Sequence, residues 1–272
     1  MTREIGVTVD QIPCTVVISD EGEALLAAKA AGRAIVAVEG KAGEDLSAAI
    51  YAAPSWEDVN KELACLVARR HLGLPWPIGE GERLKVRELV LEDRFQIPQS
   101  EGLSQEERMF CSEEGLGAYI RGQYRFCEYG IWALVKREDN RLAGLGGVTQ
   151  PRLPWEFQEA LEDYRRQVKM QGQEWEVLEL GYRIFASERR KGYATEACSI
   201  ILSYCCQVLS CRVCALIEEK NQASRRLAEN LGMKTLAVME AGNESSEKLL
   251  LYGESLPEPP DSGSPGKDSL LP

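Results

Sequence analysis

The stretch Leu178–Cys206 reads LELGYRIFASERRKGYATEACSIILSYCC, and Cys214–Lys234 further along reads CALIEEKNQASRRLAENLGMK. In the first stretch an apolar strand runs into a basic turn that contains glycine, and a helix follows at once. In the second stretch another strand leads to Asn221 and Ser224, ahead of a further helix. This order of strand, glycine turn, helix, strand and capped helix is typical of a site for a nucleotide-type cofactor.

The turn that follows the first strand has the features that an anion requires. Gly192 and Ala194 are small, so backbone amides can approach a phosphate closely, and the helix that begins near Thr195 directs its positive end at the same place. Cationic side chains before the glycine add positive charge. The residues predicted to surround a phosphate are Arg189, Arg190, Lys191, Gly192, Tyr193, Ala194 and Thr195.

These motifs resemble the acyl-CoA-binding core of the GNAT acetyltransferase superfamily, and most of all its branch related to the ribosomal-protein N-terminal acetyltransferases. The matching residues are Gly181–Ile184, Arg190–Ala197, Asn221 with Ser224, and Leu231–Met233. Domains of this branch open with a strand and an acidic turn, and RLKVRELVLED at Arg83–Asp93 is similar to that opening. The resemblance therefore spans residues 83–253.

Composition limits the class of protein. The chain has 272 residues, of which 44% are hydrophobic, so it is long enough for one large or two modest globular domains. No apolar run reaches the roughly 18 residues of a membrane span, and the start, MTREIGVTVDQIPC, lacks the layout of a signal peptide. We therefore expect no membrane partner and a cytoplasmic protein whose nine cysteines are reduced thiols.

The net charge of −11 and the pI near 4.9 describe an acidic protein. Binding to nucleic acid favours a basic surface, so we expect no nucleic acid as the main partner. An acidic surface suits a cationic small molecule or an amine better, although acidic surfaces also serve solubility.

Changes in composition divide the chain into three parts. Residues 1–82 are rich in Ala, Gly and Val, and residues 83–253 carry the acyltransferase pattern. The tail 254–272, ESLPEPPDSGSPGKDSLLP, is dense in Pro, Ser and Gly and is predicted to be disordered.

Residues 1–82 are predicted to form a small parallel α/β domain. Continuous β-branched runs indicate buried strands, and Ala- and Leu-rich stretches indicate helices between them. The predicted elements are strands at Cys14–Ile18, Ala34–Val38 and Ala48–Ala52, and helices at Glu23–Ala31 and Trp56–His71.

This domain resembles one half of a haloacid-dehalogenase-like (HAD) phosphatase core, through Val17–Asp20, Ala27–Gly32 and the strand that follows. The resemblance implies that Asp20 would help to hold Mg²⁺. However, the nucleophilic Asp-x-Asp strand of that family is absent, so no aspartyl-phosphate can form. We therefore expect a non-catalytic scaffold, a dimer surface or a ligand sensor.

Residues 83–253 are predicted to form a mixed, mostly antiparallel sheet around acyl-CoA, flanked by helices, which is the GNAT fold that the resemblance implies. The stretch Leu91–Ile120 is expected to be mostly helical, with breaks near Pro98 and Gly102. The predicted strands are Leu84–Leu89, Tyr129–Lys136, Leu142–Val148, Trp175–Phe185, Arg212–Glu218, Leu236–Met239 and Lys248–Tyr252. The other predicted helices are Phe157–Gln171, Thr195–Val208 and Ser224–Leu231.

The resemblance implies acetyl-CoA as the acyl donor and assigns residues to it. Backbone groups of Ile184 and Ala186 would bind the pantetheine arm as an added strand would, and the Asn221 side chain would reach the same arm. Ser224 would lie near the phosphates. Asn221 and Ser224 also fit a second interpretation, because either residue would cap the following helix without any ligand.

The candidate general bases are Glu179 on the cofactor strand and Glu218 at the end of the neighbouring strand; each needs a pKa raised by burial. Related enzymes place a tyrosine acid seven positions after the asparagine, where this chain has Ala228. Tyr252 or water would have to replace that acid. Glu196 is expected to interact with the positive end of its helix rather than to act in catalysis.

The cysteines and the single histidine predict no metal site. Cys211 and Cys214 have the spacing of metal ligands and cluster with Cys205 and Cys206. However, Cys214 lies in a core strand and Cys205 and Cys206 at an apolar helix end, where cysteine is commonly a small buried hydrophobe. His71 is placed at a helix end, where it would face the negative pole. With one histidine a Ser/His or Cys/His nucleophile is not expected, which favours direct transfer.

Three hypotheses follow. The first is an acetyl-CoA-dependent N-acetyltransferase that acts on a primary amine, either a peptide N-terminus or a small cationic molecule. The second is a non-catalytic acyl-CoA sensor, and the third is a structural protein with a degenerate cofactor turn. The glycine and the basic residues of the turn are present, which argues against the third. We favour the first. A homodimer is compatible with all three.

Overall fold

The computed structural model describes residues 1–40, 43–99, 102–171, 175–240 and 248–256. The chain divides into two compact units between Pro77 and Ile78. The predicted division after residue 82 lies inside the second unit, because strand β5 (Pro77–Glu80) belongs to that unit's sheet. Most of the tail predicted to be disordered, 257–272, lies outside the described residues, whereas Glu254 ends a strand.

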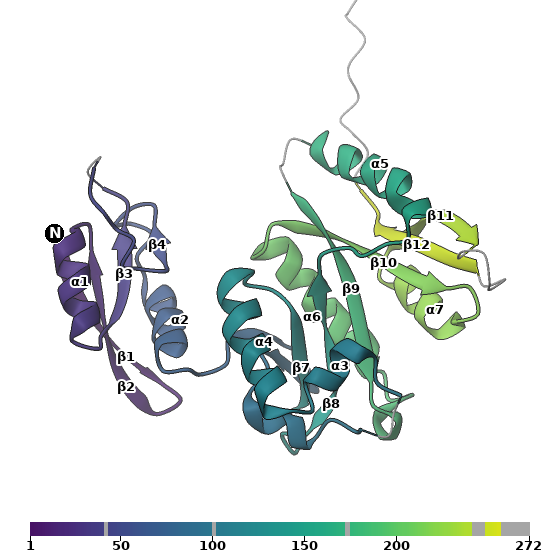
Figure 1. Ribbon diagram of the computed structural model, residues 1–272, viewed down its shortest axis with the longest axis horizontal. Helices are drawn as coiled ribbons and strands as arrows, with labels where there is room; N and C mark the ends of the chain where they lie inside the picture. Colours follow the sequence, from purple (N-terminus) through teal and green to yellow (C-terminus); the bar gives the residue numbers. More distant parts are fainter. Residues whose placement is uncertain (41–42, 100–101, 172–174, 241–247, 257–272) are drawn as a thin grey trace, which may run out of the picture. The chain divides into compact units, whose positions relative to one another are not determined.

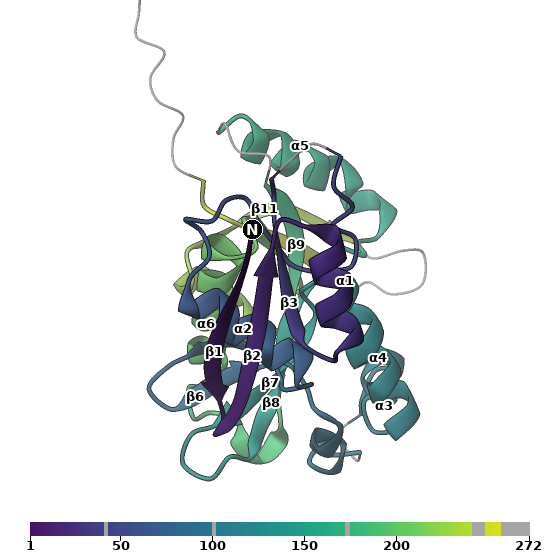
Figure 2. The same cartoon turned by 90° about the vertical axis from the view of Figure 1, so that its left-hand side faces the viewer.

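The first unit contains one sheet with the strand order β1-β2-β3-β4, of which Figure 2 labels β1, β2 and β3 side by side. Strands β2, β3 and β4 are parallel as predicted, but β1 pairs with β2 in antiparallel fashion, so the sheet is mixed rather than parallel. The bounds are β1 Thr2–Val9, β2 Ile12–Ser19, α1 Gly22–Ala30, β3 Ala34–Val38, β4 Ala52–Ala53 and α2 Lys61–His71.

The two helices of the first unit cover different side chains of the same strands. Val16 and Val36 pack with Ala64 and Val67 of α2, whereas Ala37 packs with Leu25 of α1. Successive side chains of a strand point to opposite faces, so this alternation places one helix on each face of the sheet. The resemblance of this unit to half of a HAD-like core stays a prediction.

The second unit contains an eight-stranded sheet with the order β11-β12-β10-β9-β8-β7-β6-β5 (Figure 1). Strands β9 and β10 are parallel, and the pairs from β6 to β9 and from β10 to β11 are antiparallel, so the predicted mixed, mostly antiparallel sheet is confirmed. The remaining strands are β6 Leu84–Arg87, β7 Ile131–Lys136, β8 Leu142–Thr149, β9 Glu176–Ile184, β10 Cys211–Glu218, β11 Met233–Glu240 and β12 Lys248–Glu254.

Helices cover the larger sheet. The apolar side of α5, at Leu161, Tyr164 and Val168, packs on Val177 of β9 and Leu251 of β12. Helix α6 lies along β6, β8, β9 and β10, and α7 lies against β10 and β11. The helical bounds are η1 Leu91–Phe95, α3 Gln105–Met109, α4 Glu113–Phe126, η2 Trp155–Phe157, α5 Gln158–Lys169, η3 Ala186–Glu188, α6 Tyr193–Gln207 and α7 Gln222–Asn230. No helix in the described part of the chain combines the length and apolar character of a membrane span.

Candidate functional site

Strands β9 and β10 separate along their length and form a fork in the middle of the sheet. Their parallel ladder begins at Glu176 and Cys211 and ends at Glu179 and Cys214. Beyond that point β9 follows its antiparallel partner β8, and β10 follows β12. The two strands can be followed in Figure 1. We call the space between Leu180–Ile184 and Ala215–Glu218 the fork.

The pairing of β9 with β8 decides which backbone groups face the fork. The amide of Phe185 donates to the carbonyl of Ala143 on β8 at 2.9 Å. Because the hydrogen-bonding direction alternates along a strand, the N–H and C=O groups of Leu180, Tyr182 and Ile184 point away from β8 and towards the fork. One edge of the fork is therefore the backbone of β9, ready to pair with an extended ligand.

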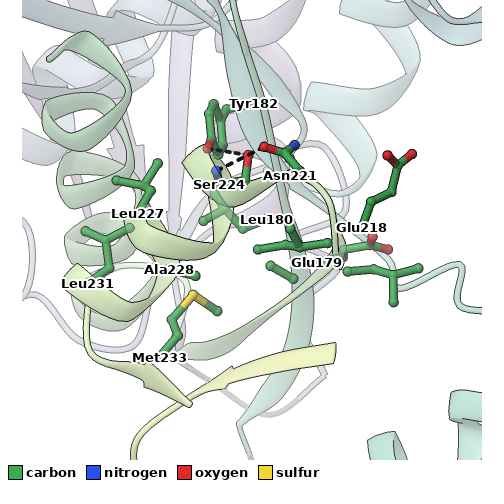
Figure 3. A pocket seen from close by; sticks show the side chains of 14 residues that line it. Glu179, Leu180, Tyr182, Glu218, Asn221, Ser224, Leu227, Ala228, Leu231 and Met233 are labelled. Carbon is green, nitrogen blue, oxygen red and sulfur yellow. Dashed lines mark hydrogen bonds between the residues drawn. The ribbon is translucent and has the colours of Figure 1, made fainter. Parts of the chain in front are cut away.

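A cavity of about 330 Å³ occupies the fork, a size within the range of small-molecule sites. Figure 3 shows its two sides, with Glu179 and Glu218 on one and the apolar side chains of α7 on the other. The lining residues are Glu179, Leu180, Gly181, Tyr182, Ala215, Leu216, Ile217, Glu218, Asn221, Ser224, Leu227, Ala228, Leu231 and Met233.

The glycine turn lies between β9 and α6. Gly192 has φ of 81° and is the N-cap of α6, which begins at Tyr193, two residues before the predicted start near Thr195. The left-handed conformation favours glycine, because a side chain there is strained. The first intrahelical bond runs from the Glu196 amide to the Gly192 carbonyl, so the amides of Tyr193, Ala194 and Thr195 have no partner within the helix. The turn thus has the predicted features of an anion site.

The cations of the turn differ in their surroundings. Arg189 donates through Nε to the carbonyl of Ile184 at 3.1 Å, which ties the turn to the end of β9. Lys191 lies 2.9 Å from the carboxylate of Glu188, and Arg190 is exposed with φ of 62°. Of the Ile184 backbone groups predicted to bind pantetheine, the carbonyl therefore has a partner in the chain itself, and Ala186 is exposed in the helical turn η3.

Arg83 adds a cation to this turn that the sequence motif does not include. Its Nη1 donates to the Lys191 carbonyl at 2.6 Å, and its guanidinium carbon lies 5.1 Å from the centre of the Tyr193 ring. Glu196 holds Arg83 in place by accepting from its Nε and from the backbone amides of Arg83 and Leu84. Glu196 thus attaches β6 to α6, which is a structural role.

The two candidate bases both line the cavity, but in different settings. Glu179 Oε2 accepts from the backbone amide of Arg152 at 3.1 Å, on the segment that follows β8. The Glu218 side chain is 49% exposed and lies 3.5 Å from Nζ of Lys220. Glu179 is the carboxylate at the point where the fork opens, because the β9–β10 ladder ends there.

Asn221 and Ser224 meet in the cavity wall at the beginning of α7. Asn221 is the N-cap, and its Oδ1 accepts from the Ser224 amide at 3.1 Å, so the capping interpretation is confirmed. The Tyr182 hydroxyl lies 2.9 Å from Ser224 Oγ (Figure 3). Ser224 is therefore placed beside Tyr182 in the cavity, whereas the residues of the glycine turn are not among those that line it.

Tyr252 does not line this cavity. Its ring is buried on β12, and its hydroxyl lies 3.3 Å from both Arg225 Nε and Glu229 Oε1 of α7. The structure thus brings Glu179 and Glu218 together but leaves the third predicted catalytic residue outside. Ala228 does line the cavity, at the position where related enzymes have a tyrosine.

The structure arranges no group of three or more His, Cys, Asp or Glu side chains for a metal within the residues it describes. Cys211 and Cys214 are three positions apart on β10, so their side chains point to opposite faces of the sheet. In the first unit Asp20 accepts a hydrogen bond from the Met1 amino group, and His71 is the last residue of α2.

Leu180 and Tyr182, whose side chains line the cavity and whose backbone groups face the fork, were not predicted from the sequence. The apolar wall at Leu227, Leu231 and Met233 was not predicted either. The alternation along β9 could have indicated the two residues of that strand, because every second residue counted from Ile184 points its backbone groups in the same direction as Ile184 does. Which of the two alternating sets faces the fork depends on the pairing of β9 with β8, and this pairing cannot be read from the sequence.

Comparison with known proteins agrees with this geometry. A family model described as "Acetyltransferase (GNAT) domain" matches residues 83–234, which is more than half of the chain. The match begins at Arg83, just before β6, and ends just after α7, so it contains the fork, the glycine turn and the cavity.

Solved structures with some likeness to the chain include a ribosomal-protein-S5-alanine acetyltransferase from Vibrio fischeri, which is 14% identical, with 65% of this chain and 94% of that chain covered and a TM-score of 0.47. An acetyltransferase of the GNAT family from Bacillus anthracis is 18% identical, with coverage of 64% and 95% and a TM-score of 0.44. An acetyltransferase from Agrobacterium tumefaciens is 19% identical, with coverage of 65% and 94% and a TM-score of 0.42. At these scores we draw no conclusion from the three structures.

Proposed function

Since the chain belongs to the GNAT acetyltransferase family, we propose that it is an N-acetyltransferase that moves an acetyl group from acetyl-CoA to a primary amine by direct transfer. The observation that supports this best is the fork between β9 and β10. It combines an open strand edge, a cavity and a glycine turn that leads into a helix N-terminus within one continuous stretch of chain.

The residues present fit an acyl-CoA. The backbone groups of Tyr182 and the backbone amide of Ile184, which face the fork, suit the amides of a pantetheine arm, and the side-chain amide of Asn221 can donate to the same arm. The backbone amides of Tyr193–Thr195, with Arg83 and Arg190 nearby, suit a pyrophosphate. Acetyl-CoA, when bound, supplies an acetyl group activated as a thioester.

Glu179 is the general base in this proposal. It lies where the fork opens, and the Arg152 amide fixes one of its carboxylate oxygens, which orients the other. Glu179 takes the proton that the amine loses as the new C–N bond forms, directly or through one water. Glu218 lines the same cavity but is half exposed, so it is assigned the lesser role of attracting a cationic acceptor.

The acceptor is a primary amine, carried either by a peptide N-terminus or by a small cationic molecule. Two carboxylates in the cavity and a net charge of −11 support a cation over a nucleic acid. The first unit is assigned a non-catalytic role as a scaffold or dimer surface. All nine cysteines are free thiols, which supports a reducing compartment such as the cytoplasm.

Calorimetric titration of acetyl-CoA into the purified protein tests this function, alongside Gly192→Glu. The substitution places a carboxylate at the anion turn, next to Arg83, so we expect micromolar binding by the wild type and a loss of at least about 100-fold in the variant. Gly32→Glu is the matched control. Gly32 also has a positive φ, of 68°, and open space where a Cβ would lie, but it follows helix α1 of the first unit.

An amine-library screen for acetylation then separates the remaining hypotheses. Acetylation of any primary amine supports the transferase. Tight binding of acetyl-CoA without transfer to any amine would favour the sensor. A wild-type protein that binds no acetyl-CoA would contradict both.

A further inference from the structure

The cavity contains one pair of hydroxyl groups among the residues that line it, Tyr182 and Ser224. The two oxygens lie 2.9 Å apart, and the pair joins the middle of β9 to the beginning of α7 across the fork. Ser224 is held there because its own amide is bound by the Asn221 cap. The phenol of Tyr182 is therefore fixed at the wall of the cavity in which the proposed function places the thioester.

The other groups around the cavity do not offer a proton to a leaving sulfur. Glu179 and Glu218 are carboxylates, which accept rather than donate when ionised. Ala228 has no proton to give, and the Tyr252 hydroxyl lies outside, between Arg225 and Glu229. Of the two hydroxyls that remain, a phenol with an ordinary pKa of about 10 is far more acidic than a serine.

We propose that Tyr182 is the catalytic acid that protonates the departing CoA thiolate, and that Ser224 positions its hydroxyl. This assignment rests on the proposed function. As the amine nitrogen bonds to the acetyl carbon and the C–S bond breaks, Glu179 holds the proton that the nitrogen has lost. Tyr182 gives its O–H proton to the sulfur, and its phenolate regains a proton from water in the open cavity. Mass and charge balance over the cycle once Glu179 releases its proton to water.

The surroundings of Tyr182 keep its proton in place between turnovers. Burial raises the pKa of Tyr182 above its ordinary value, against the opposing effect of the hydrogen bond with Ser224, so the phenol is protonated at neutral pH. Cys198 on α6 also lies near this phenol, and burial raises the pKa of its thiol to about 12. The other titratable groups at the cavity are Glu179 and Glu218, which are carboxyls.

The first test needs no acceptor and measures the pKa of the thiol of bound CoA by the ultraviolet absorbance of its thiolate. A hydrogen bond from Tyr182 stabilises the thiolate, so Tyr182→Phe is expected to raise that pKa by about one unit, with CoA still bound. Ser224→Ala, which removes only the positioning contact, is expected to raise it by less. Desulfo-CoA is the binding control, because its affinity should be the same in wild type and both variants to within about threefold.

The second test uses the amine that the screen identifies. Tyr182→Phe is expected to lower kcat at least about tenfold while the KM for acetyl-CoA changes less than about threefold. A variant with an unchanged thiol pKa and unchanged kcat would overturn the assignment. A larger effect of Ser224→Ala than of Tyr182→Phe would also overturn it, since the serine would then be the donor. If the wild type binds no CoA, the proposed function itself fails. If the wild type binds CoA and acetylates the amine but Tyr182→Phe does so equally well, only the assignment of Tyr182 fails.

Discussion

Each unit of the molecule contains a parallel strand pair whose ladder is four residue pairs long, β2–β3 in the first and β9–β10 in the second. In the first unit the ladder runs to Ser19, the last residue of β2. In the second unit both strands continue beyond the last pair, each led away by its own antiparallel partner. The same local pairing thus stops where strand β2 stops in the first unit, which we call a closed end. In the second unit it leads into the open fork.

The surroundings of the carboxylates at the ends of the two ladders differ accordingly. After β2 the Asp20 carboxylate accepts from the Met1 amino group, and the Glu21 amide donates to Ser19 Oγ at 3.1 Å. After the β9–β10 ladder, Glu179 faces a cavity. Ligands of open α/β sheets bind beyond the carboxyl ends of parallel strands. We therefore expect that in this chain a ligand binds beyond the parallel ladder only where the strands separate, and that Asp20 has a structural role.

The largest expected effect comes from exchanging these two carboxylates for amides. Glu179→Gln keeps the shape of the side chain but cannot take a proton, so kcat should fall at least about 100-fold while acetyl-CoA binding stays within about threefold. Asp20→Asn should leave both unchanged. Steady-state kinetics and calorimetry on the two variants measure this.

A loss of kcat in Asp20→Asn as large as that in Glu179→Gln would break the comparison, because the closed end would then contribute to the reaction. If Glu218→Gln reduced kcat and Glu179→Gln did not, the base would lie on β10 and the fork would keep its function with the roles exchanged.

Replacing the glutamates in the first turns of α6 and α2 should have a smaller effect, which falls on the stability of the fold rather than on kcat. Glu196 accepts three hydrogen bonds, at 2.6, 2.9 and 2.9 Å, that attach β6 to α6. Glu196→Gln should therefore cost about 1.5–3 kcal/mol in the free energy of unfolding. Glu62, in the first turn of α2, is exposed, so Glu62→Gln should cost well under about 1 kcal/mol. Denaturant titration measures both.

The pH dependence of the stability of the same variants tests whether the charge of Glu196 causes this loss of stability. Burial alone would raise the pKa of Glu196, but the bonds from Arg83 and Leu84 prevail and lower it below its ordinary 4.5. A depressed carboxyl pKa stabilises the fold above about pH 4.5, and this contribution is lost as the pH falls through the folded value. Glu196→Gln should flatten the loss of stability on that acid side, and an unchanged acid profile would contradict the assignment.

Much of this architecture could be predicted from the sequence because local signals were strong. The apolar run AIVAV of β3 predicted its bounds, and the glycine turn with its basic residues predicted the loop between β9 and α6. Strand β1 was missed because its first residues are exposed and charged, with burial only at Val7 and Val9. Helix α2 begins at Lys61 rather than at Trp56, because Asn60 caps it there.

The site was harder to predict because it depends on partners that are distant in sequence. Tyr182 faces the cavity, and the Ile184 backbone faces the fork, only because β9 pairs with β8 in one particular register. Tyr252 was named as a possible substitute for the missing tyrosine acid, yet its hydroxyl points to Arg225 and Glu229. Position along a strand is visible in a sequence, whereas the face and the neighbour are set by the assembled sheet.

The smallest expected effect compares two asparagine caps. Asn60 accepts from the Leu63 amide at 2.8 Å at the start of α2, and Asn221 accepts from the Ser224 amide at 3.1 Å at the start of α7. Replacing either with alanine should cost about 1 kcal/mol in stability. Only Asn221→Ala should also weaken acetyl-CoA binding, by about threefold to tenfold, since it alone lies at the fork.

Asn221→Asp separates the two roles of this residue, because aspartate caps a helix as well as asparagine but has no amide to donate to a ligand. Its stability by denaturant titration should match the wild type, while its affinity for acetyl-CoA by calorimetry should fall at least as far as that of Asn221→Ala, since the new charge also opposes an anionic ligand. Full affinity in Asn221→Asp would show that this asparagine serves α7 as Asn60 serves α2. The distinction between the closed end of the β2–β3 ladder and the fork of the β9–β10 ladder would then rest on the strands alone.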